Sequence, residues 1–244
     1  MTWLNRIIPN DRIIRLQLLI LVAVMLAFSL TLGQRFFSLG NFQSISSQLP
    51  ILGMLALGMG LTMLTGGINL SIIAGANACS LVMAAIIVSH PDQPLFLLLA
   101  LVAGLLVAVM IGALNGLLIS VVGVSPILAT LGTMTLITGL NILLSNGDVI
   151  SDFPPVIQYI GSGDIAGIPV AMILFLLVSA GLWVLLEHTT LVRSIYLVGS
   201  NEQATRFSGV NTHRVQVAVY ILSAVLGWGA AILMMAKFNS AKAG

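Results

Sequence analysis

Runs of apolar residues recur along this sequence, each about long enough to cross a bilayer, with short polar segments between them. A spanning helix needs roughly 20 mainly apolar residues. We therefore predict an all-α, polytopic helical membrane protein with about seven spans. The second, third and fifth runs are the least regular, and each could be broken or re-entrant. The predicted spans are Leu16–Gly33, Leu49–Gly66, Ser71–Val88, Leu95–Val121, Pro126–Ser145, Pro169–Leu186 and Val215–Ala236.

The segments between the spans differ in charge, and this difference predicts the orientation. Asn146–Ile168 carries three aspartates and no Lys or Arg, whereas Glu187–Arg214 carries three arginines. Cytoplasmic loops of membrane proteins carry an excess of basic residues. We therefore place the N-terminus, with Arg6, Arg12 and Arg15, in the cytoplasm. Seven crossings then leave Glu187–Arg214 inside and Asn146–Ile168 outside.

Two further expectations concern the first apolar run and the segment that follows it. The first apolar run is followed by Gln34 and Arg35 rather than by a small-x-small cleavage site, so we expect a retained span and not a signal peptide. From Phe36 to Gln48, Phe, Leu and Ile alternate with Ser and Gln. This pattern predicts a short amphipathic helix at the membrane interface.

The composition agrees with the bilayer as the solvent. Hydrophobic residues make up 59% of the chain and charged residues 7%, whereas a soluble domain is about 25% charged. The net charge of +2 gives no reason to expect a nucleic-acid partner. The one cysteine, Cys79, excludes an internal disulfide and a paired-cysteine metal site. Because it lies in an apolar run, we expect it to be a small buried residue.

Ionisable side chains are missing from the interior of every predicted span. Such groups mark proton relays and ion paths in membranes, so their absence argues against a proton-coupled transporter, a pump and an intramembrane protease. The sequence also lacks the GxxxxGK[ST] phosphate loop of an ATPase. Energy for transport would come from a separate ATPase, or from sodium held by backbone carbonyls. We expect no catalytic residue, metal or cofactor on this chain.

Uncharged polar side chains occur in the spans at helical spacing instead. Thr62, Thr65 and Asn69 follow the spacing i, i+3, i+7, which predicts one shared helix face. Amides and hydroxyls suit a neutral, hydroxylated solute, but they also join helices to one another, so packing stays open as the alternative. The candidate solute-pathway residues are Thr62, Thr65, Asn69, Ser71, Asn77, Asn115, Thr130 and Thr133. The pair Gly112 and Gly116 predicts close helix packing.

Asn201 to Gly209 has the local signals of a short helix. Asn201 is a good N-cap residue, Glu202 and Arg206 suit the two ends of the helix dipole, and Gly209 suits the position after a C-terminus. A helix this short is unstable alone, so its small apolar face of Ala204 and Phe207 should be docked. Its own membrane domain and a cleft in a partner are both open as the docking site.

Four ordered stretches identify a family. Gly66-Gly67-Ile68-Asn69-Leu70-Ser71 resembles the Gly-Gly-Ile-Asp-Leu-Ser motif of permease subunits of bacterial ABC importers of the ribose type, a superfamily shared with branched-chain amino acid permeases. Asn69 replaces the family's Asp, and Ile73-Ala74 replaces Gly-Ser, which suggests a divergent solute class. The three further matches are Val124–Thr133, Tyr196–Gly209, and Tyr220–Ser223 taken together with Ser240-Ala241 at the exit of the same span.

The resemblance implies a permease that translocates a monosaccharide or similar polyol across the bacterial inner membrane. It implies two ABC ATPase subunits that bind the ATP, a solute-binding protein outside, and a second permease copy or homologue. Residues 187–214 would be the cytoplasmic coupling loop of a single permease domain over 1–244, incomplete at its C-terminus because family members continue with further spans. A sodium-coupled secondary transporter and a non-transporting membrane fragment are the alternatives. The implied ATPase-coupling residues are Asn201, Glu202, Ala204, Arg206, Phe207 and Gly209.

Overall fold

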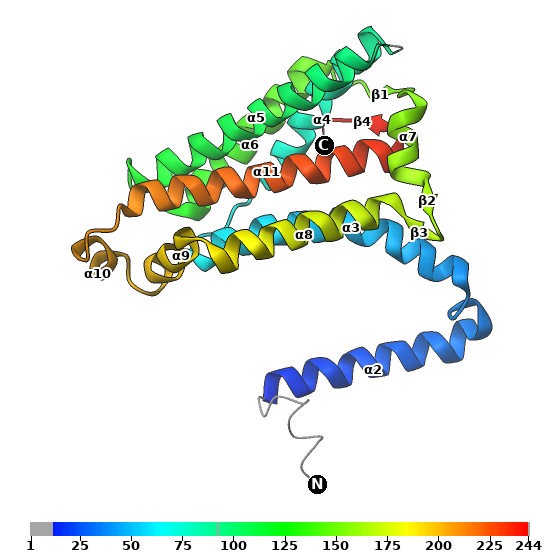
Figure 1. Cartoon of the computed structure of the whole chain (residues 1–244), viewed down its shortest axis with the longest axis horizontal. Coiled ribbons are helices and arrows are strands. Elements are labelled where there is room, and N and C mark those ends of the chain that lie inside the picture. The colour runs from blue at the N-terminus through cyan, green and yellow to red at the C-terminus, as the bar shows by residue number, and fades with distance from the viewer. Residues whose placement is uncertain (1–11, 92, 244) are drawn as a thin grey trace. The chain divides into compact units, whose positions relative to one another are not determined.

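The computed structural model describes residues 12–91 and 93–243, apart from the side chain of Ile13. Arg6 of the basic N-terminus lies outside these residues. Within the described residues, seven helices are long and apolar enough to cross a membrane, which confirms the all-α, polytopic prediction. The chain forms two compact units, residues 1–45 and 46–244. The seven helices are α2 Arg12–Leu32, α3 Leu39–Leu64, α4 Ile72–Ser89, α5 Pro94–Ser120, α6 Pro126–Ser145, α8 Val170–His188 and α11 Thr212–Phe238 (Figure 1).

The first unit holds α2, the 3-10 turn η1 (Gly33–Arg35) and the first turns of α3. Stacked rings of Phe28 and Phe36, 6.2 Å between centroids, close the turn after α2. The Asn41 side chain donates to the carbonyl of Phe36 at 2.8 Å and so satisfies a backbone group at the start of α3.

The predicted interfacial helix between Phe36 and Gln48 is wrong as a separate element. Its residues from Leu39 onward are the first turns of α3, which continues through Pro50 to Leu64. A proline inside a soluble helix usually breaks it because it lacks an N–H and its ring clashes with a carbonyl one turn earlier. Within membranes, neighbouring helices make such a proline tolerable, and Pro50 is buried among them.

The core of the second unit is the antiparallel pair α5 and α11. A small residue stands at every fourth position along the buried face of α5, and each is buried: Ala100, Gly104, Ala108, Gly112, Gly116 and Ser120. A Cβ added at Gly112 would lie 2.6 Å from the Cα of Ile221, and one at Gly116 would lie 2.6 Å from the Cα of Val217. The two backbones therefore touch, which confirms the packing prediction for Gly112 and Gly116.

Helix α4 packs on this pair, and its buried residues join a hydrophobic cluster with α5 and α11 that includes Cys79. Cys79 is 1% exposed, as predicted for a small buried residue. Helix α6 contacts both α4 and α5, and it is an unbroken helix of 20 residues that begins at Pro126. The proline at the first helical position costs no hydrogen bond there, so the fifth predicted span is not broken.

The acidic segment between α6 and α8 is folded rather than a simple loop. It contains β1 (Ile150–Ser151), α7 (Pro155–Ser162), β2 (Asp164–Ile165) and β3 (Ile168–Pro169). Strand β1 pairs with β4 (Ser240–Ala241) beyond α11, and β2 pairs with β3. Helix α7 packs on the end of α11, where Gly161 lies directly against the carbonyl of Ala236.

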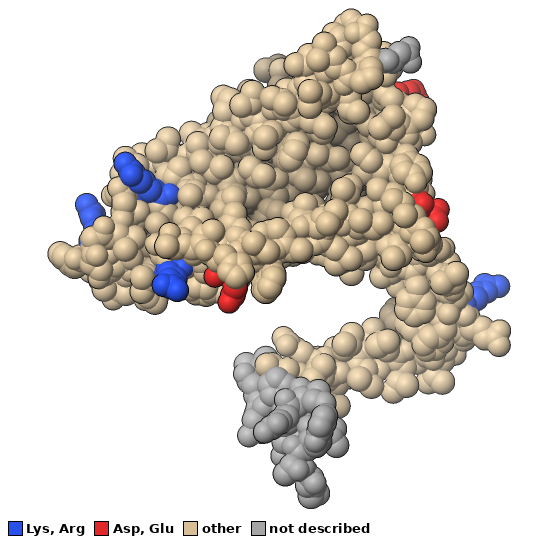
Figure 2. All heavy atoms as spheres, in the orientation of Figure 1, with Lys and Arg blue, Asp and Glu red and all other residues tan. Residues whose placement is uncertain are grey.

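The pairing of β1 with β4 also determines which connections share an end of the second unit. It places the acidic segment at the C-terminal end of α11. Helix α8 leads away from this end, and α9 (Thr190–Ser200) and α10 (Glu202–Phe207) lie at the opposite end, before α11 returns (Figure 1). The acidic and basic segments are therefore at opposite ends, as their charges predict. Figure 2 shows blue Lys and Arg atoms around the α9–α10 end.

Candidate functional site

The break between α3 and α4 begins with a glycine cap. The N–H of Gly67 donates to the carbonyl of Thr62 and the N–H of Gly66 to that of Met63, each at 3.0 Å. Gly66 has φ +80°, in the left-handed region. These features define a Schellman motif, in which the backbone turns sharply away from the helix. The chain from Gly67 to Leu70 then runs without helix as far as Ser71 and α4.

This cap makes the predicted shared face of Thr62, Thr65 and Asn69 wrong. Thr65 follows the last residue of α3, and Asn69 lies beyond the Schellman turn, so the i, i+7 relation of a helix does not apply. The hydroxyl of Thr62 donates to Met59 and that of Thr65 to Thr62, each to a carbonyl of its own segment. Neither threonine points its hydroxyl toward Asn69.

Thr130 of α6 satisfies the backbone of the break. Its hydroxyl oxygen accepts from the N–H of Leu70 at 3.2 Å, and its hydrogen is within reach of the carbonyls of Ile68 at 3.0 Å and Pro126 at 2.8 Å. Unpaired backbone groups are costly inside a bilayer, so this single side chain permits an irregular segment at that depth. Thr130 is fully buried.

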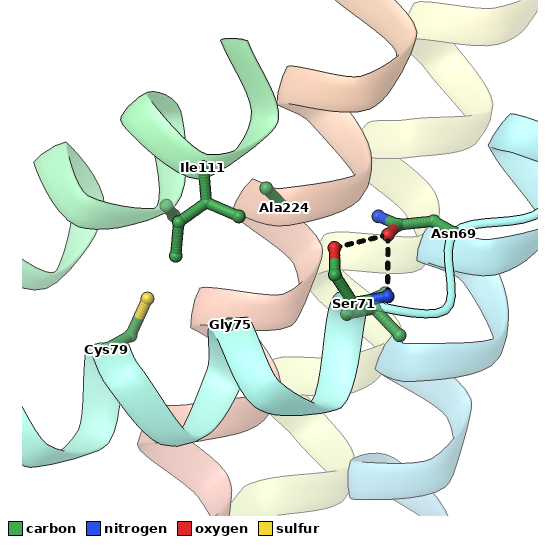
Figure 3. Close-up of a pocket in the computed structure, with 8 residues that line it drawn as sticks. Asn69, Ser71, Gly75, Cys79, Ile111 and Ala224 are labelled. Carbon is green, nitrogen blue, oxygen red and sulfur yellow. Dashed lines mark hydrogen bonds between the residues drawn. The ribbon is translucent and has the colours of Figure 1, made fainter. Parts of the chain in front are cut away.

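Four side chains from three segments form a buried network around Asn69. Asn115 of α5 donates to the hydroxyl of Ser71 at 2.8 Å, and Ser71 donates its hydroxyl and its N–H to the Asn69 carbonyl oxygen at 2.8 and 3.1 Å. The Asn69 amide donates to the hydroxyl of Ser223 in α11 at 3.0 Å. All four residues are buried. Figure 3 shows the two bonds between Asn69 and Ser71 beside the cavity.

A small cavity adjoins the network. Asn69 and Ser71 contribute the polar part of its lining, and Gly75, Cys79 and the α5 residue Ile111 are among the others that line it (Figure 3). The cavity measures about 10 Å³, close to the smallest volume that holds one water molecule. A monosaccharide does not fit, so the helices must separate before any sugar passes at this level.

The remaining predicted pathway residues lie apart from the network. Thr133 is buried in α6 and donates to the carbonyl of Ala129 in its own helix. Asn77 is buried on α4, one to two turns beyond the break, and its backbone carbonyl accepts from Ser80. The structure thus brings together Asn69, Ser71, Asn115 and Thr130 of the predicted set.

Sequence reasoning left two buried polar residues that join helices out of the candidate set. Ser223 pairs with Asn69 across 154 positions, and Asn141 donates to the carbonyl of Ala74 at 3.1 Å. Local spacing carries no signal for a contact between residues so far apart. Tyr220, one turn before Ser223, places its hydroxyl directly against Gly67, where a side chain on the glycine would overlap it.

The α9–α10 segment has the predicted caps. The Asn201 side chain accepts from the N–H of Ala204 at 2.9 Å, and Gly209 has φ +85° with its N–H bonded to the carbonyl of Arg206. The buried residue of α10 is Thr205, whereas Ala204 is exposed and Phe207 is 93% exposed. The structure therefore does not dock the face formed by Ala204 and Phe207 on the chain's own membrane domain.

The charged residues of α10 lie at its two ends. Glu202 lies in the first turn and Arg206 in the last turn of α10, as the helix dipole favours. Among the residues described here, no group of three or more His, Cys, Asp or Glu is placed to hold a metal ion. The buried network consists of amides and hydroxyls, so it can recognise a solute only through hydrogen bonds.

Comparisons with known proteins find one matching family and several similar chains. Residues 41–244 match the family described as "Branched-chain amino acid transport system / permease component". The chain is 32% identical over 233 residues to the ribose import permease protein RbsC of Escherichia coli, covering 92% of the chain and 70% of that protein. The RbsC of Bacillus subtilis is 35% identical over 204 residues, 83% of the chain and 62% of that protein.

A second kind of relative is the autoinducer 2 import system permease protein LsrD of Escherichia coli. It is 28% identical over 229 residues, which cover 91% of the chain and 68% of that protein. No solved structure matches the chain at a significant level.

Proposed function

Since this chain belongs to the family of branched-chain amino acid transport system permease components, we propose that it imports a small neutral, hydroxylated solute, such as a monosaccharide, with energy from a separate ATPase. It is a multi-pass membrane permease and a transport subunit. The names of two relatives, which import ribose and autoinducer 2, support the solute class. So does the uncharged network of Asn69, Ser71, Asn115 and Ser223.

The solute path runs past this network when the helices separate. The amide and hydroxyl groups that now bond to one another then become donors and acceptors for the hydroxyls of a sugar. Residues of α3, α4 and α6 extend the proposed path, with Thr130 holding the break in place. They are Thr62 and Thr65 at the end of α3, Asn77, Thr130 and Thr133. The packing role and the pathway role are compatible because each bond can be exchanged for one to the solute.

The observation that carries ATP coupling is the exposed α10 helix. Phe207 stands out from the end of the domain that carries Arg193, Arg206 and Arg214. A large exposed aromatic on a capped helix too short to fold alone is suited to a pocket in another subunit. We assign that pocket to the ATPase. The proposed contacts are made by Asn201, Glu202, Ala204, Arg206, Phe207 and Gly209.

The orientation proposed is N-terminus in the cytoplasm. The basic α9–α10 end then faces the ATPases, and the acidic end faces a solute-binding protein outside. A second permease copy or homologue completes the importer. Cysteines at Ser151 and Ser200, in a background that lacks Cys79, provide the measurement. An impermeant thiol reagent on cells with a permeabilised outer membrane should label position 151 only. Labelling at position 200 would show that the α9–α10 end faces outward and would refute the proposed orientation.

Replacement of Phe207 by alanine tests the ATPase partnership. Burial of a phenylalanine contributes roughly 1.5–3 kcal/mol, and about 1.4 kcal/mol is a factor of ten in affinity. We therefore expect Phe207→Ala to lower co-purification of the ATPase by about tenfold or more. The measurement is the amount of ATPase retained with detergent-extracted permease.

Phe238→Ala is the matched control for this test. Phe238 is also an exposed phenylalanine, at the other end of α11, and its loss should leave ATPase binding unchanged. Equal retention of the ATPase by both variants would refute coupling through α10. Uptake into vesicles that hold the wild-type chain alone, driven by a sodium gradient, would instead establish the secondary transporter.

A further inference from the structure

Helix α9 is packed on α11, which carries Ser223 of the network, and on α3, which leads into the break. Ile195 and Val198 are 0% and 3% exposed. They share one hydrophobic cluster with Leu61 in the last turn of α3 and with Val215 and Val219 at the start of α11. The segment outside the membrane is therefore packed on the cytoplasmic end of the second unit, in the orientation proposed above, and does not hang free as a loop.

Gly199 is a point of very close approach between α9 and the end of α3. A Cβ at this position would overlap the carbonyl oxygen of Leu64, the last residue of α3, and would lie 3.5 Å from the Cα of Thr65. Gly199 has no left-handed backbone conformation that would call for glycine. Space alone accounts for glycine here, since any side chain would push α9 away from the start of the break.

The connection from α9 to α10 is short and is held by backbone hydrogen bonds to both helices. Asn201 alone separates the two helices. Its N–H donates to the carbonyl of Leu197 at 3.0 Å, and its own carbonyl accepts from the N–H of Thr205 at 3.0 Å and from the Thr205 hydroxyl at 2.8 Å. A displacement of α10 must therefore carry α9 with it.

The break on the other side of Gly199 is held just as firmly. Four residues separate Leu64 from Asn69 along the chain, and the Schellman bonds, Thr130 and the Tyr220 hydroxyl confine the backbone between them. A movement at Leu64 is thus transmitted to Asn69, which bonds to α5 through Ser71 and to α11 directly. Interfaces packed this closely shift as units rather than deform gradually.

We propose that Gly199 is a positioning residue for transport: through its contact with Leu64, movement of α10 by the ATPase displaces the 65–70 break and opens the Asn69 network. This inference rests on the proposed function, because it needs an ATPase on α10. It adds the contact, between Gly199 and Leu64, through which the movement of α10 reaches the membrane-spanning helices. The contact transmits the movement without touching either the solute or the ATP.

Cys79 provides a reporter that needs no knowledge of the solute. It lines the cavity beside Asn69 and is 1% exposed. The complex with the co-purified ATPase would be treated with N-ethylmaleimide, with and without a non-hydrolysable ATP analogue. In the wild type, the analogue should change the rate of Cys79 labelling. Gly199→Ala should abolish this nucleotide dependence while the ATPase remains bound.

Ser200→Ala is the matched control, because Ser200 is exposed and its hydroxyl donates only to the carbonyl of Leu197. This variant should keep the wild-type nucleotide dependence. A Gly199→Ala complex with wild-type nucleotide dependence overturns the proposal, and so does a wild type whose Cys79 labelling rate does not change with the analogue.

Should Gly199→Ala fail to fold, amide hydrogen exchange in the wild-type complex decides: exchange at residues 65–70 must respond to the analogue. Absence of any ATPase in the purified wild type would refute the proposed function itself.

Discussion

Gly112→Leu is expected to prevent the chain from accumulating as a folded membrane protein. The Cβ alone would lie 2.6 Å from the Cα of Ile221 and 2.7 Å from the carbonyl oxygen of Tyr220. Both neighbours are backbone atoms, which cannot rotate away as a side chain can. Extra methylenes in a packed core typically cost 1–3 kcal/mol, and here the cost falls on the longest helix contact in the domain. Size-exclusion profiles and thermal unfolding in detergent are the measurements.

Gly181→Leu is the control for this substitution. Gly181 lies on the exposed face of α8, and a Cβ there meets no atom within 4 Å. The same change in volume should be harmless at that position, because lipid accommodates it. Equal stability of the Gly112→Leu and Gly181→Leu proteins would show that α5 and α11 do not depend on backbone contact.

Asn69→Leu is expected to lower solute uptake by about tenfold or more. Leucine lacks the carbonyl oxygen that accepts two hydrogen bonds from Ser71 and the amide that donates one to Ser223. All three residues are buried. Each buried group left without a partner costs about 1–3 kcal/mol, although bonds between membrane helices average only about 0.6 kcal/mol. The effect should therefore fall on transport more than on assembly. Uptake of radiolabelled D-ribose, normalised to the amount of complex, is the measurement.

Asn141→Leu separates the two roles of a buried asparagine. Asn141 makes one bond between α6 and α4, to the carbonyl of Ala74, and lies outside the Asn69 network. Its loss should affect stability without affecting uptake per complex. Normal uptake by Asn69→Leu would refute its place in the pathway, while equal loss of assembly in both variants would establish packing as the role of both residues.

The seven spans were predictable because the bilayer imposes one requirement on each of them: about 20 apolar residues. Predicted bounds such as Pro126–Ser145 agree with α6 residue for residue. The caps of α10 were predictable for a different reason. Asn201 and Gly209 act on backbone groups within four residues of themselves, so their effect is local.

The errors arose where distant residues decide. Pro50 favours a helix start in isolation, yet its surroundings allow α3 to run through it from Leu39. The acidic segment folds around Phe153, which is buried, and pairs with residues 240–241, which lie about ninety positions away. Ser223 became a partner of Asn69 only because the glycine stripe of α5 brings α11 close. No local pattern could have predicted these contacts.

The network of amides and hydroxyls has a consequence for bioenergetics. Moving one elementary charge through a membrane potential of 100 mV changes the free energy by about 2.3 kcal/mol. Within the described spans, Asp, Glu, Lys, Arg and His occur only in the first and last turns. Opening the network around Asn69 therefore moves no charged side chain across the field. With a neutral solute, the permease would work equally well in energised and depolarised cells, so import would depend on the supply of ATP and not on the voltage.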